Sequence, residues 1–398
     1  MLGLLVAACS SGGGSGGGGG DAAGKLRLWH TFSPRETEAL NEYLAGYPAP
    51  VEPTLLPFSR AQRIVAETLA AGEDCPDLVR IDATWLPGLA REKRIASIPK
   101  SVAARDWLPE AAELARYRTI DYGMPQAIDG LALLYDPERV AAAGVSWPPQ
   151  SIGDLLAIAH RLTIDGKYGL SVRVDGYWFV AFLRAWGGDV LDPAARTLGV
   201  DQPIAATALT RFAALFATGG VAPPPAAPDE AAPTTARRFR DGDVAIVVDG
   251  PWAVADLRSG DRELGVAAFP NDPVGRPAAP FGGQLFVVPK CARDPDAAWA
   301  LARALTDPAL QAQWSARLGL VPTTEDGLAR AGAFAQSFRE ALLHARPLPR
   351  HAAATEMFDD LTPAVAAVVA GDATADEALA GVARAWTRLI ARQEAPAP

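Results

Sequence analysis

The order of apolar and polar residues over the first hundred positions alternates between strand-like and helix-like patterns. Residues 25–29 (KLRLW) place apolar and polar side chains in turn, which is typical of a half-buried strand. Ser33 and Pro34 predict the start of a helix, because serine is a favoured N-cap and proline suits the first helical turn. We expect that helix to reach residue 45, further strands at 51–56 and 77–81, and further helices at 61–71 and 85–91. This alternation favours an α/β fold with largely parallel sheets.

The pattern continues beyond residue 120. Strands are predicted at 131–135, 243–248 and 284–288, and helices after Asp136, at 151–162, at 177–185 and over most of the chain from 295 onward. Residues 222–235 (APPPAAPDEAAPTT) interrupt both patterns with prolines, so we expect a solvated surface loop there.

Composition limits the classes of protein. A length of 398 residues corresponds to two or more domains. Hydrophobic residues at 49% and charged residues at 21% exclude global disorder and a multi-spanning membrane protein. The net charge of -9, without a strongly basic tract, argues against nucleic acid as a partner. Three cysteines and four histidines, with no CxxC or HExxH, argue against a disulfide scaffold and a zinc site, and we expect neither metal nor cofactor.

The N-terminal 24 residues differ from the rest of the chain. Residues 1–8 (MLGLLVAA) are apolar and end at Cys9, after which a Ser/Gly-rich stretch follows. This junction resembles the bacterial lipoprotein signal, in which a cysteine after small residues is lipidated, so we expect a signal remnant, a lipid on Cys9 and a flexible tether. The apolar run is short and no Lys or Arg precedes it. We therefore expect that the gene starts further upstream or that the chain was trimmed.

Four segments, in this order, resemble the maltose-binding-protein-like family 1 of extracellular solute-binding proteins of ABC importers. They are 77–98 (DLVRIDATWLPGLAREKRIASI), 122–140 (YGMPQAIDGLALLYDPERV), 241–252 (DGDVAIVVDGPW) and 281–324, which closes with GLVPTT. The resemblance implies a type II periplasmic-binding-protein-like α/β fold with a ligand cleft between two lobes. The lobes would be residues 25–127 plus 284–331 and residues 131–280 plus 332–398, with hinges near 127–131, 280–284 and 331.

The same resemblance implies a function. The protein would be the substrate-binding component of an ABC importer that captures a carbohydrate, a di- or oligosaccharide, and delivers it to the membrane permease subunits. We expect an exported monomer, periplasmic or on the cell surface, held to the membrane only by the lipid on Cys9, with no catalytic residues.

The aromatic candidates follow from the chemistry of sugars, which present apolar C–H faces that stack on flat rings. Trp252 matches the sugar-stacking tryptophan of the family's GPW motif, and Phe358 falls where the family has a second stacking aromatic. Tyr177 and Trp178 match a ligand-facing aromatic stretch. Each of the four could instead be a core residue.

The polar candidates would accept hydrogen bonds from sugar hydroxyls. Asp82 ends the strand 77–81 and Trp85 follows it, in a loop that supplies polar contacts in the family; Asp82 could instead cap the next helix. Asp129 lies in the first hinge and matches an acidic residue that the family uses on its ligand.

Weaker candidates complete the predicted site. His30, with the neighbouring Thr31 and Phe32, ends the first strand, although a lone histidine is usually only a satisfied polar group. Gly282 and Gly283 would let backbone approach a ligand, or serve only as flexible turn residues. Arg350 is the last candidate.

Two other functions stay open at this point. Asp82 and Asp129 could be the acid and base of a secreted glycan-active enzyme, although no catalytic motif supports this. Asp82, Asp129 and Asp249 could instead bind a polyamine or another non-sugar solute. A metal ligand set is disfavoured, because the histidines at 30, 160, 344 and 351 show no ligand spacing.

The resemblance also implies a disulfide. Cys75 lies just before the strand 77–81 and Cys291 just after the strand 284–288. In the family these two strands are antiparallel neighbours, which would bring the two cysteines together in an oxidising compartment.

Overall fold

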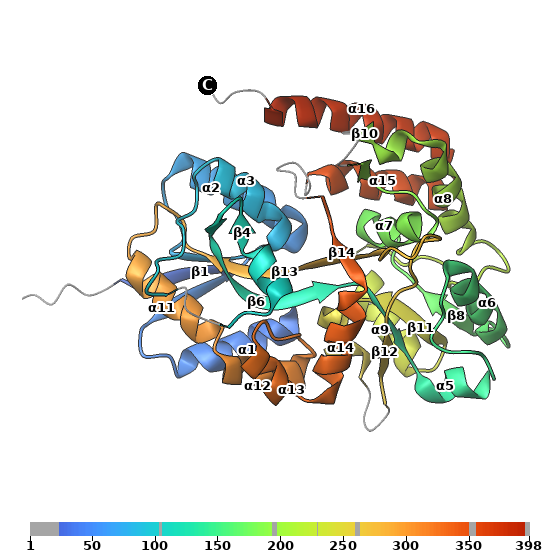
Figure 1. The fold of residues 1–398 in the computed structure, drawn as a ribbon, viewed down its shortest axis with the longest axis horizontal. Helices are drawn as coiled ribbons and strands as arrows, with labels where there is room; N and C mark the ends of the chain where they lie inside the picture. Colours follow the sequence, from blue (N-terminus) through green and yellow to red (C-terminus); the bar gives the residue numbers. More distant parts are fainter. Residues whose placement is uncertain are drawn as a thin grey trace, which may run out of the picture.

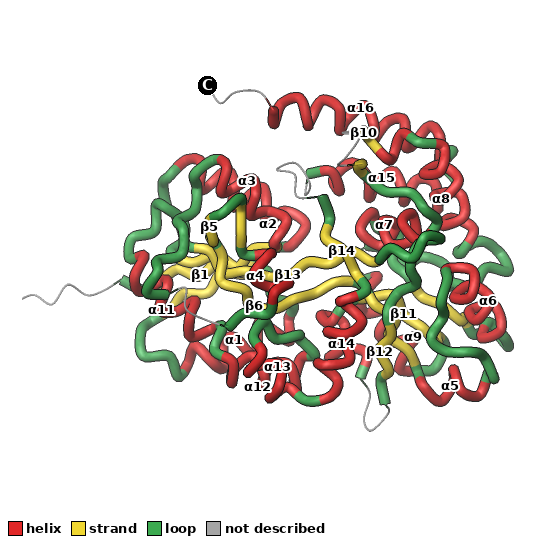
Figure 2. Tube along the Cα trace, viewed as in Figure 1, coloured by secondary structure: helices red, strands yellow, loops and turns green. Residues whose placement is uncertain are grey.

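The computed structural model describes residues 24–102, 106–192, 197–228, 230–258, 263–349 and 356–394. Its elements form two lobes that lie side by side, each with a β-sheet and surrounding helices (Figure 1). Strands β6 (Gly123–Gly130), β13 (Ala279–Val287) and β14 (Ala345–Pro347) lie in the middle of the molecule, where the yellow strands of Figure 2 run from one lobe toward the other.

The first lobe is built on a six-stranded sheet with the order β14-β13-β3-β1-β2, in which β6 also pairs with β13. Strand β1 (Leu26–His30) is parallel to β2 (Val51–Leu55) and β3 (Leu78–Asp82), whereas β13 is antiparallel to β3 and β6 and parallel to β14. Its remaining elements are α1 (Pro34–Ala45), α2 (Phe58–Ala71), the 3-10 helix η1 (Ala83–Trp85), α3 (Leu86–Arg91), α4 (Pro109–Leu114), β4 (Arg116–Tyr117), β5 (Ile120–Asp121), α11 (Pro295–Leu305), α12 (Pro308–Leu318) and α13 (Glu325–Ala331).

The second lobe is built on a four-stranded sheet with the order β12-β7-β11-β8. Strand β11 (Val244–Asp249) is parallel to β8 (Tyr168–Ser171) and antiparallel to β7 (Ala132–Tyr135), which is antiparallel to β12 (Gly265–Ala267). Its remaining elements are α5 (Pro137–Ala142), α6 (Ile152–Leu162), α7 (Gly176–Ala185), β9 (Leu191–Asp192), β10 (Thr197–Leu198), η2 (Gly199–Asp201), α8 (Pro203–Ala214), α9 (Ala231–Arg240), η3 (Pro251–Ala253), α10 (Val254–Leu257), α14 (Ala333–Leu343), α15 (Met357–Ala370) and α16 (Ala375–Glu394).

Two features differ from the sequence predictions. The sheets are mixed rather than largely parallel, because β13 and β7 each run against two neighbours. The proline-rich stretch 222–235 is not loop throughout, since α9 begins at Ala231. Pro233 falls in the first turn of that helix, where a backbone N–H has no intrahelical partner and its absence costs little.

Local sequence explains where the elements next to the first sheet begin. Strand β1 alternates buried and half-buried residues, so one face packs on the core. Helix α1 begins with a capping box, in which the Ser33 hydroxyl accepts the Glu36 N–H and the Glu36 carboxylate accepts the Ser33 N–H. Asp82 ends β3 and caps η1 through the Thr84 N–H, at 2.8 Å. Both turns lie at the carboxyl ends of parallel strands, where α/β folds place their ligands.

The two cysteines in the described part of the chain are joined. Cys75 and Cys291 form a disulfide with Cα atoms 5.9 Å apart, inside the distance that a disulfide needs. Cys75 precedes β3 and Cys291 follows β13, and the antiparallel pairing of these strands brings the cysteines together. The bond joins two cysteines that are 216 positions apart in the sequence. The chain between them contains the whole sheet of the second lobe.

Reduction of this disulfide is expected to lower the free energy of unfolding by about 2 to 4 kcal/mol, because an open chain gains more entropy on unfolding. Thermal unfolding with and without reductant measures the effect. A Cys75→Ala/Cys291→Ala double variant is the control, and its midpoint should not respond to reductant. An unchanged wild-type midpoint, although thiol titration shows that the bond was reduced, would contradict the prediction.

Candidate functional site

Three neighbouring strands bring two carboxylates and one amide together. Asp82 ends β3, Asp129 lies in β6, and Gln284 lies in β13 between them. The Gln284 Nε2 donates one hydrogen bond to Asp82 Oδ2 and one to Asp129 Oδ2, each at 3.2 Å. We call Asp82 and Asp129 the acid pair. Because one amide group bridges both carboxylates, the pair forms a single polar surface.

A buried arginine lies beside the acid pair. Arg80 is two residues before Asp82, so both side chains lie on the same face of β3. Its guanidinium donates to Gln126 Oε1 at 3.0 Å and to Thr31 Oγ1 at 3.2 Å, and it lies 3.9 Å from the buried carboxylate of Glu36. Three carboxylates, those of Glu36, Asp82 and Asp129, therefore surround one guanidinium.

Burial and mutual repulsion shift the protonation of the acid pair. Removal from water and the neighbouring charge of Asp82 raise the pKa of Asp129 to about 7, although Gln284 and Arg80 act in the opposite direction. Burial also raises the pKa of Asp82, against the hydrogen bonds from Thr84 and Gln284 and the charge of Arg80. At neutral pH the pair is thus a surface that takes up positive charge or hydrogen-bond donors.

This shift predicts how stability depends on pH. The folded protein keeps the Asp129 proton up to about pH 7, whereas the unfolded chain releases it at the ordinary pKa of 3.8. The folded state binds more protons in that window, so its stability falls as the pH rises through it. Asp129→Asn, which stays neutral, is expected to be more stable than the wild type at about pH 8 and to lose less stability between about pH 5 and about pH 8.

Thermal unfolding of the unliganded proteins at both pH values measures this difference. Asp326→Asn is a matched control, because the Asp326 carboxylate is 57% exposed and its loss should leave the pH dependence unchanged. A parallel pH dependence of Asp129→Asn and wild type would contradict the prediction.

An aromatic group of the second lobe supplies flat surfaces. Trp178 in α7 is fixed by a hydrogen bond from its indole N–H to the Val248 carbonyl, at 2.7 Å. Trp252 in η3 lies with its ring 6.3 Å from that of Trp178, edge to face, and Phe358 in α15 lies 6.1 Å from Tyr177. We call Tyr177, Trp178, Trp252 and Phe358 the aromatic wall. Three of its members are only partly buried, so their surfaces are available for stacking.

A glycine holds Trp252 in place. A Cβ on Gly250 would lie 2.3 Å from the Trp252 ring, so only glycine lets the indole fold back over the backbone. The Trp252 side chain also forms a hydrogen bond with the buried Asp249 carboxylate. The sequence Asp-Gly-Pro-Trp after β11 therefore sets the orientation of the ring.

One residue of the aromatic wall, Tyr177, lies near the acid pair. Burial, followed by the negative charges of Asp129 and then Asp82, raises the pKa of the Tyr177 hydroxyl well above its usual value. These charges act on Tyr177 only because its hydroxyl lies near both carboxylates. Tyr177 belongs to α7 of the second lobe, so residues from both lobes meet at this point.

Several other predicted residues lie deeper. His30 is 1% exposed and accepts a hydrogen bond from the Phe32 N–H, and burial and the charge of Arg80 lower its pKa to about 4. The Arg80 guanidinium lies over the Phe32 ring, with its Cζ atom 4.1 Å from the centre of that ring. Trp85 is 3% exposed and packs on Phe58. These side chains support the site from beneath rather than forming its surface.

The two glycines of β13 have different neighbours. A Cβ on Gly282 would lie 3.1 Å from Asp129 Oδ1, and Gly282 lines a small hollow together with Thr84 and Phe281. A Cβ on Gly283 would lie 2.5 Å from the Ala127 carbonyl oxygen, so this glycine is needed for the pairing of β13 with β6. Arg350 and Cys9 lie outside the described residues.

The sequence predictions missed three polar residues at this site, namely Arg80, Glu36 and Gln284. Arg80 carried a signal, because it is a charged residue within the apolar run DLVRI. Gln284 directly follows the two glycines of the predicted hinge, but only the strand pairing shows that it joins Asp82 to Asp129.

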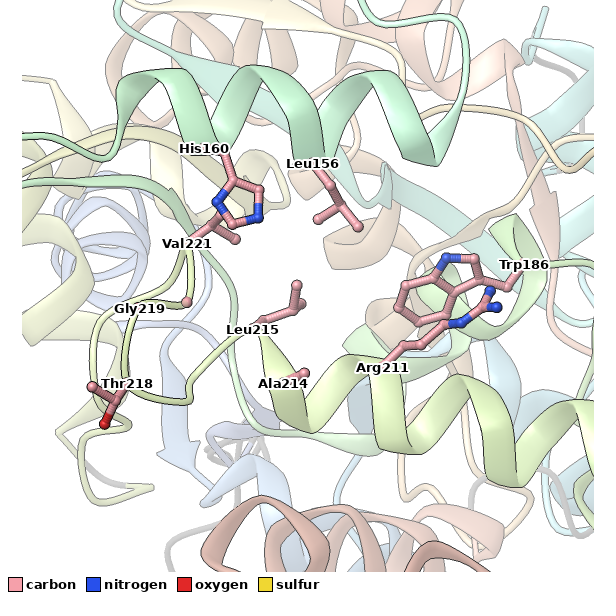
Figure 3. Close-up of a pocket in the computed structure, with 10 residues that line it drawn as sticks. Leu156, His160, Trp186, Arg211, Ala214, Leu215, Thr218, Gly219 and Val221 are labelled. Carbon is pink, nitrogen blue, oxygen red and sulfur yellow. The ribbon is translucent and has the colours of Figure 1, made fainter.

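A second hollow lies apart from these residues, on the second lobe between α6 and the end of α8 (Figure 3). It has a volume of about 440 Å³, and Trp186 and Arg211 lie at one end of it and His160 at the other. We call it the side hollow. Its lining contains no carboxylate and none of the predicted site residues, so it offers a sugar few acceptors for its hydroxyls.

No described helix is both long and apolar enough to cross a membrane. Within the same residues, no three side chains of His, Cys, Asp or Glu are grouped so that they could hold a metal ion.

Two α/β lobes joined by several chain crossings, with an acid pair on one lobe near Tyr177 of the other, define a two-lobed binding protein of the type II periplasmic fold. The profile of the family described as bacterial extracellular solute-binding protein matches residues 54–337, and the chain belongs to this family. The family comprises exported binding proteins rather than enzymes.

Individual relatives and solved structures agree with this assignment. The chain is 24% identical over 345 residues to the maltotriose-binding protein of Pyrococcus abyssi, an alignment that covers 82% of this chain and 74% of that protein. The structure matches the GacH receptor of Streptomyces glaucescens, solved unliganded and with acarbose, at a TM-score of 0.81 and 28% identity, over 93% of this chain and 99% of that one. It also matches maltose-bound MalE3 of T. maritima at a TM-score of 0.81 and 24% identity, over 92% and 99% of the two chains.

Proposed function

We propose that this protein is the substrate-binding component of an ABC importer, and that it captures a di- or oligosaccharide between its two lobes and delivers it to a membrane permease. The acid pair, bridged by Gln284 and close to Tyr177 of the aromatic wall, is the observation that carries the proposal. Two relatives support the proposal: the protein of Pyrococcus abyssi is a maltotriose-binding protein, and one of Bacillus subtilis is a maltodextrin-binding protein.

The two surfaces match the two kinds of surface on a sugar. The apolar C–H face of a pyranose would stack on Trp252, whose ring is held by Gly250 and Asp249. The hydroxyls at the ring edge would donate to Asp82 and Asp129, which are buried enough for such hydrogen bonds to be strong. Tyr177 would supply a hydroxyl between the two surfaces.

Binding between the lobes would favour a closed arrangement. We propose lobe boundaries at the three crossings near residues 127–131, 280–284 and 331, which would act as hinges. Opposite charges already meet between the lobes: Arg35 in α1 pairs with Asp256 in α10 at 2.7 Å, and Arg63 in α2 acts on Asp359 in α15. A ligand that contacts both lobes would shift the population toward closure.

Small-angle scattering tests this closure. The radius of gyration is expected to decrease when the protein is saturated with its sugar, and Trp252→Ala, which weakens binding, is expected to need more sugar for the same decrease. An unchanged radius at saturation would contradict the hinge proposal.

We further propose that the protein acts as a monomer and is anchored by a lipid on Cys9, through the glycine-rich tether that follows it. Expression with an export signal, followed by membrane fractionation, tests the anchor. The wild type should be recovered with membranes, and Cys9→Ser should be recovered in the soluble fraction.

A thermal-shift screen over mono-, di- and oligosaccharides tests the proposed function, because a ligand at 100 times its dissociation constant stabilises a protein by about 2.7 kcal/mol. Polyamines in the same screen test the alternative solute, and an assay for released reducing sugar tests the glycan-active enzyme. Stabilisation by a sugar, without its hydrolysis, is the expected result. Stabilisation by polyamines alone, or turnover of the sugar, would contradict it.

A further inference from the structure

The acid pair carries more negative charge than its surroundings balance. Arg80 makes its close polar contacts with Glu36, Gln126 and Thr31, and not with the acid pair. Its charge acts on both Asp82 and Asp129 from further away. The three carboxylates of Glu36, Asp82 and Asp129 therefore have one guanidinium, that of Arg80, as their nearby cation.

The other ionisable groups nearby do not supply a second cation. His30 is held neutral, because burial and the charge of Arg80 lower its pKa to about 4. Arg173 pairs with Asp249 at 3.3 Å, and Arg184 donates to Asp189 at 2.9 Å, so both already have carboxylate partners.

Two acceptors of the site lack donors. Gln284 Oε1 is buried and has no hydrogen-bond partner in the part of the chain that the structure describes. Asp129 accepts from Gln284 through Oδ2, whereas no described group donates to its Oδ1. That oxygen lies 3.1 Å from the position that a Cβ on Gly282 would take, so a glycine there leaves space beside it.

These observations favour a ligand group with several hydrogen-bond donors and a positive charge. A hydroxyl offers one donor and no charge, whereas a protonated amine offers two or three donors, no acceptor and a full charge. The ring of Tyr177, which lies near the acid pair, would also attract a cation through its π face.

We propose that the site selects a carbohydrate that carries a protonated amine, such as an amino sugar or an aminocyclitol unit, with the ammonium group bound to Asp129 and Gln284. This inference rests on the proposed function and names its substrate class. A carbohydrate without the amine would still stack on the wall and donate its hydroxyls to the acid pair, but it would leave the charge unbalanced.

The selectivity is expected to depend on pH, because a proton competes with the ammonium group for the acid pair. The raised pKa of Asp129 places this competition near pH 7. The titratable and charged groups that face Asp129 are Asp82 and Arg80 of β3, Glu36 of α1, His30 of β1 and Tyr177 of α7. His30 is neutral and Arg80 is charged throughout the range from about pH 5.5 to about pH 7.5, so a change in this range reports on the carboxylates.

Titration calorimetry with two probes tests the proposal. One probe is maltotriose with one 6-hydroxyl replaced by a primary amine, which is protonated at about pH 7.5, and the other is unmodified maltotriose. At about pH 7.5 we expect the amine-bearing sugar to bind at least about tenfold more tightly, because hydrogen bonds to charged groups are the stronger ones. This advantage should shrink to less than about threefold in Asp129→Asn, and in the wild type at about pH 5.5.

Asp326→Asn is the matched control, because Asp326 is an acid of α13 outside the acid pair with 57% of its side chain exposed, and the advantage of the amine-bearing sugar should persist there. Equal affinities for the two probes in the wild type, or an advantage that persists in Asp129→Asn, would overturn the proposal while leaving the proposed function intact. Binding of neither probe nor any sugar of the screen would overturn both.

Discussion

Replacing Arg80 by methionine is expected to lower the free energy of unfolding by about 3 to 5 kcal/mol at about pH 7.5, which is the usual cost of removing one partner from a buried ion pair. Methionine keeps much of the side-chain volume, so the loss is electrostatic rather than a cavity. Arg80 is 4% exposed and is the guanidinium that stands against Glu36, Asp82 and Asp129. Without it, the buried carboxylates of Glu36 and Asp129 and the half-buried carboxylate of Asp82 remain with no cation among them.

The pH dependence separates this cause from lost packing. At about pH 5 the raised pKa of Asp129 lets it take up a proton in the folded state, so the penalty in Arg80→Met should become smaller. Arg35→Met is the matched control. Arg35 pairs with Asp256 on the surface, with 59% of its side chain exposed, so this substitution should lower the free energy of unfolding by less than about 1 kcal/mol. Chemical denaturation at both pH values measures the free energies. A loss in Arg80→Met that is the same at both pH values would contradict the electrostatic account.

Replacing Trp252 by alanine is expected to weaken binding of the best sugar by about 2 to 4 kcal/mol, which is about 30-fold to about 1000-fold in the dissociation constant. The change removes both the stacking surface and its apolar burial. Trp252 is only partly buried, and Gly250 and Asp249 hold its ring at the edge of the second-lobe core. The fold should therefore survive the substitution.

Trp186→Ala is the matched control for Trp252→Ala. Trp186 is another partly buried tryptophan of the second lobe, but it lines the side hollow instead of the aromatic wall. Titration calorimetry should show wild-type affinity for this variant. Wild-type affinity of a folded Trp252→Ala, judged by circular dichroism, would place the sugar elsewhere.

The sequence predicted the strands whose patterns are local. Strand β1 was expected at 25–29 and occupies Leu26–His30, since its alternation and the Ser33 cap are both visible in the sequence. Strand β6 was not expected, because Gly123, Pro125 and Asp129 are residue types that strands disfavour. It forms because β13 is its partner strand and its other edge makes only a single bridge, from Ile128 to Val321, so Pro125 need not donate to a second neighbour.

The candidate site was predictable residue by residue but not as an arrangement. Asp82 and Asp129 were expected separately, whereas the amide that bridges them lies 202 and 155 positions away from them in the sequence. No local pattern encodes contacts at that separation. The burial of side chains could not be predicted from the sequence either. Trp85 follows Asp82 closely, but the 3-10 turn between them directs the Trp85 ring against Phe58.

A crystal structure of the protein with the best sugar of the screen tests the central claim most directly. We expect one pyranose ring stacked on Trp252 and polar groups of the ligand within hydrogen-bond distance of Asp82 and Asp129, with both lobes in contact with the sugar. Density for the sugar in the side hollow or elsewhere on the surface, with Trp252 and the acid pair untouched, would contradict it.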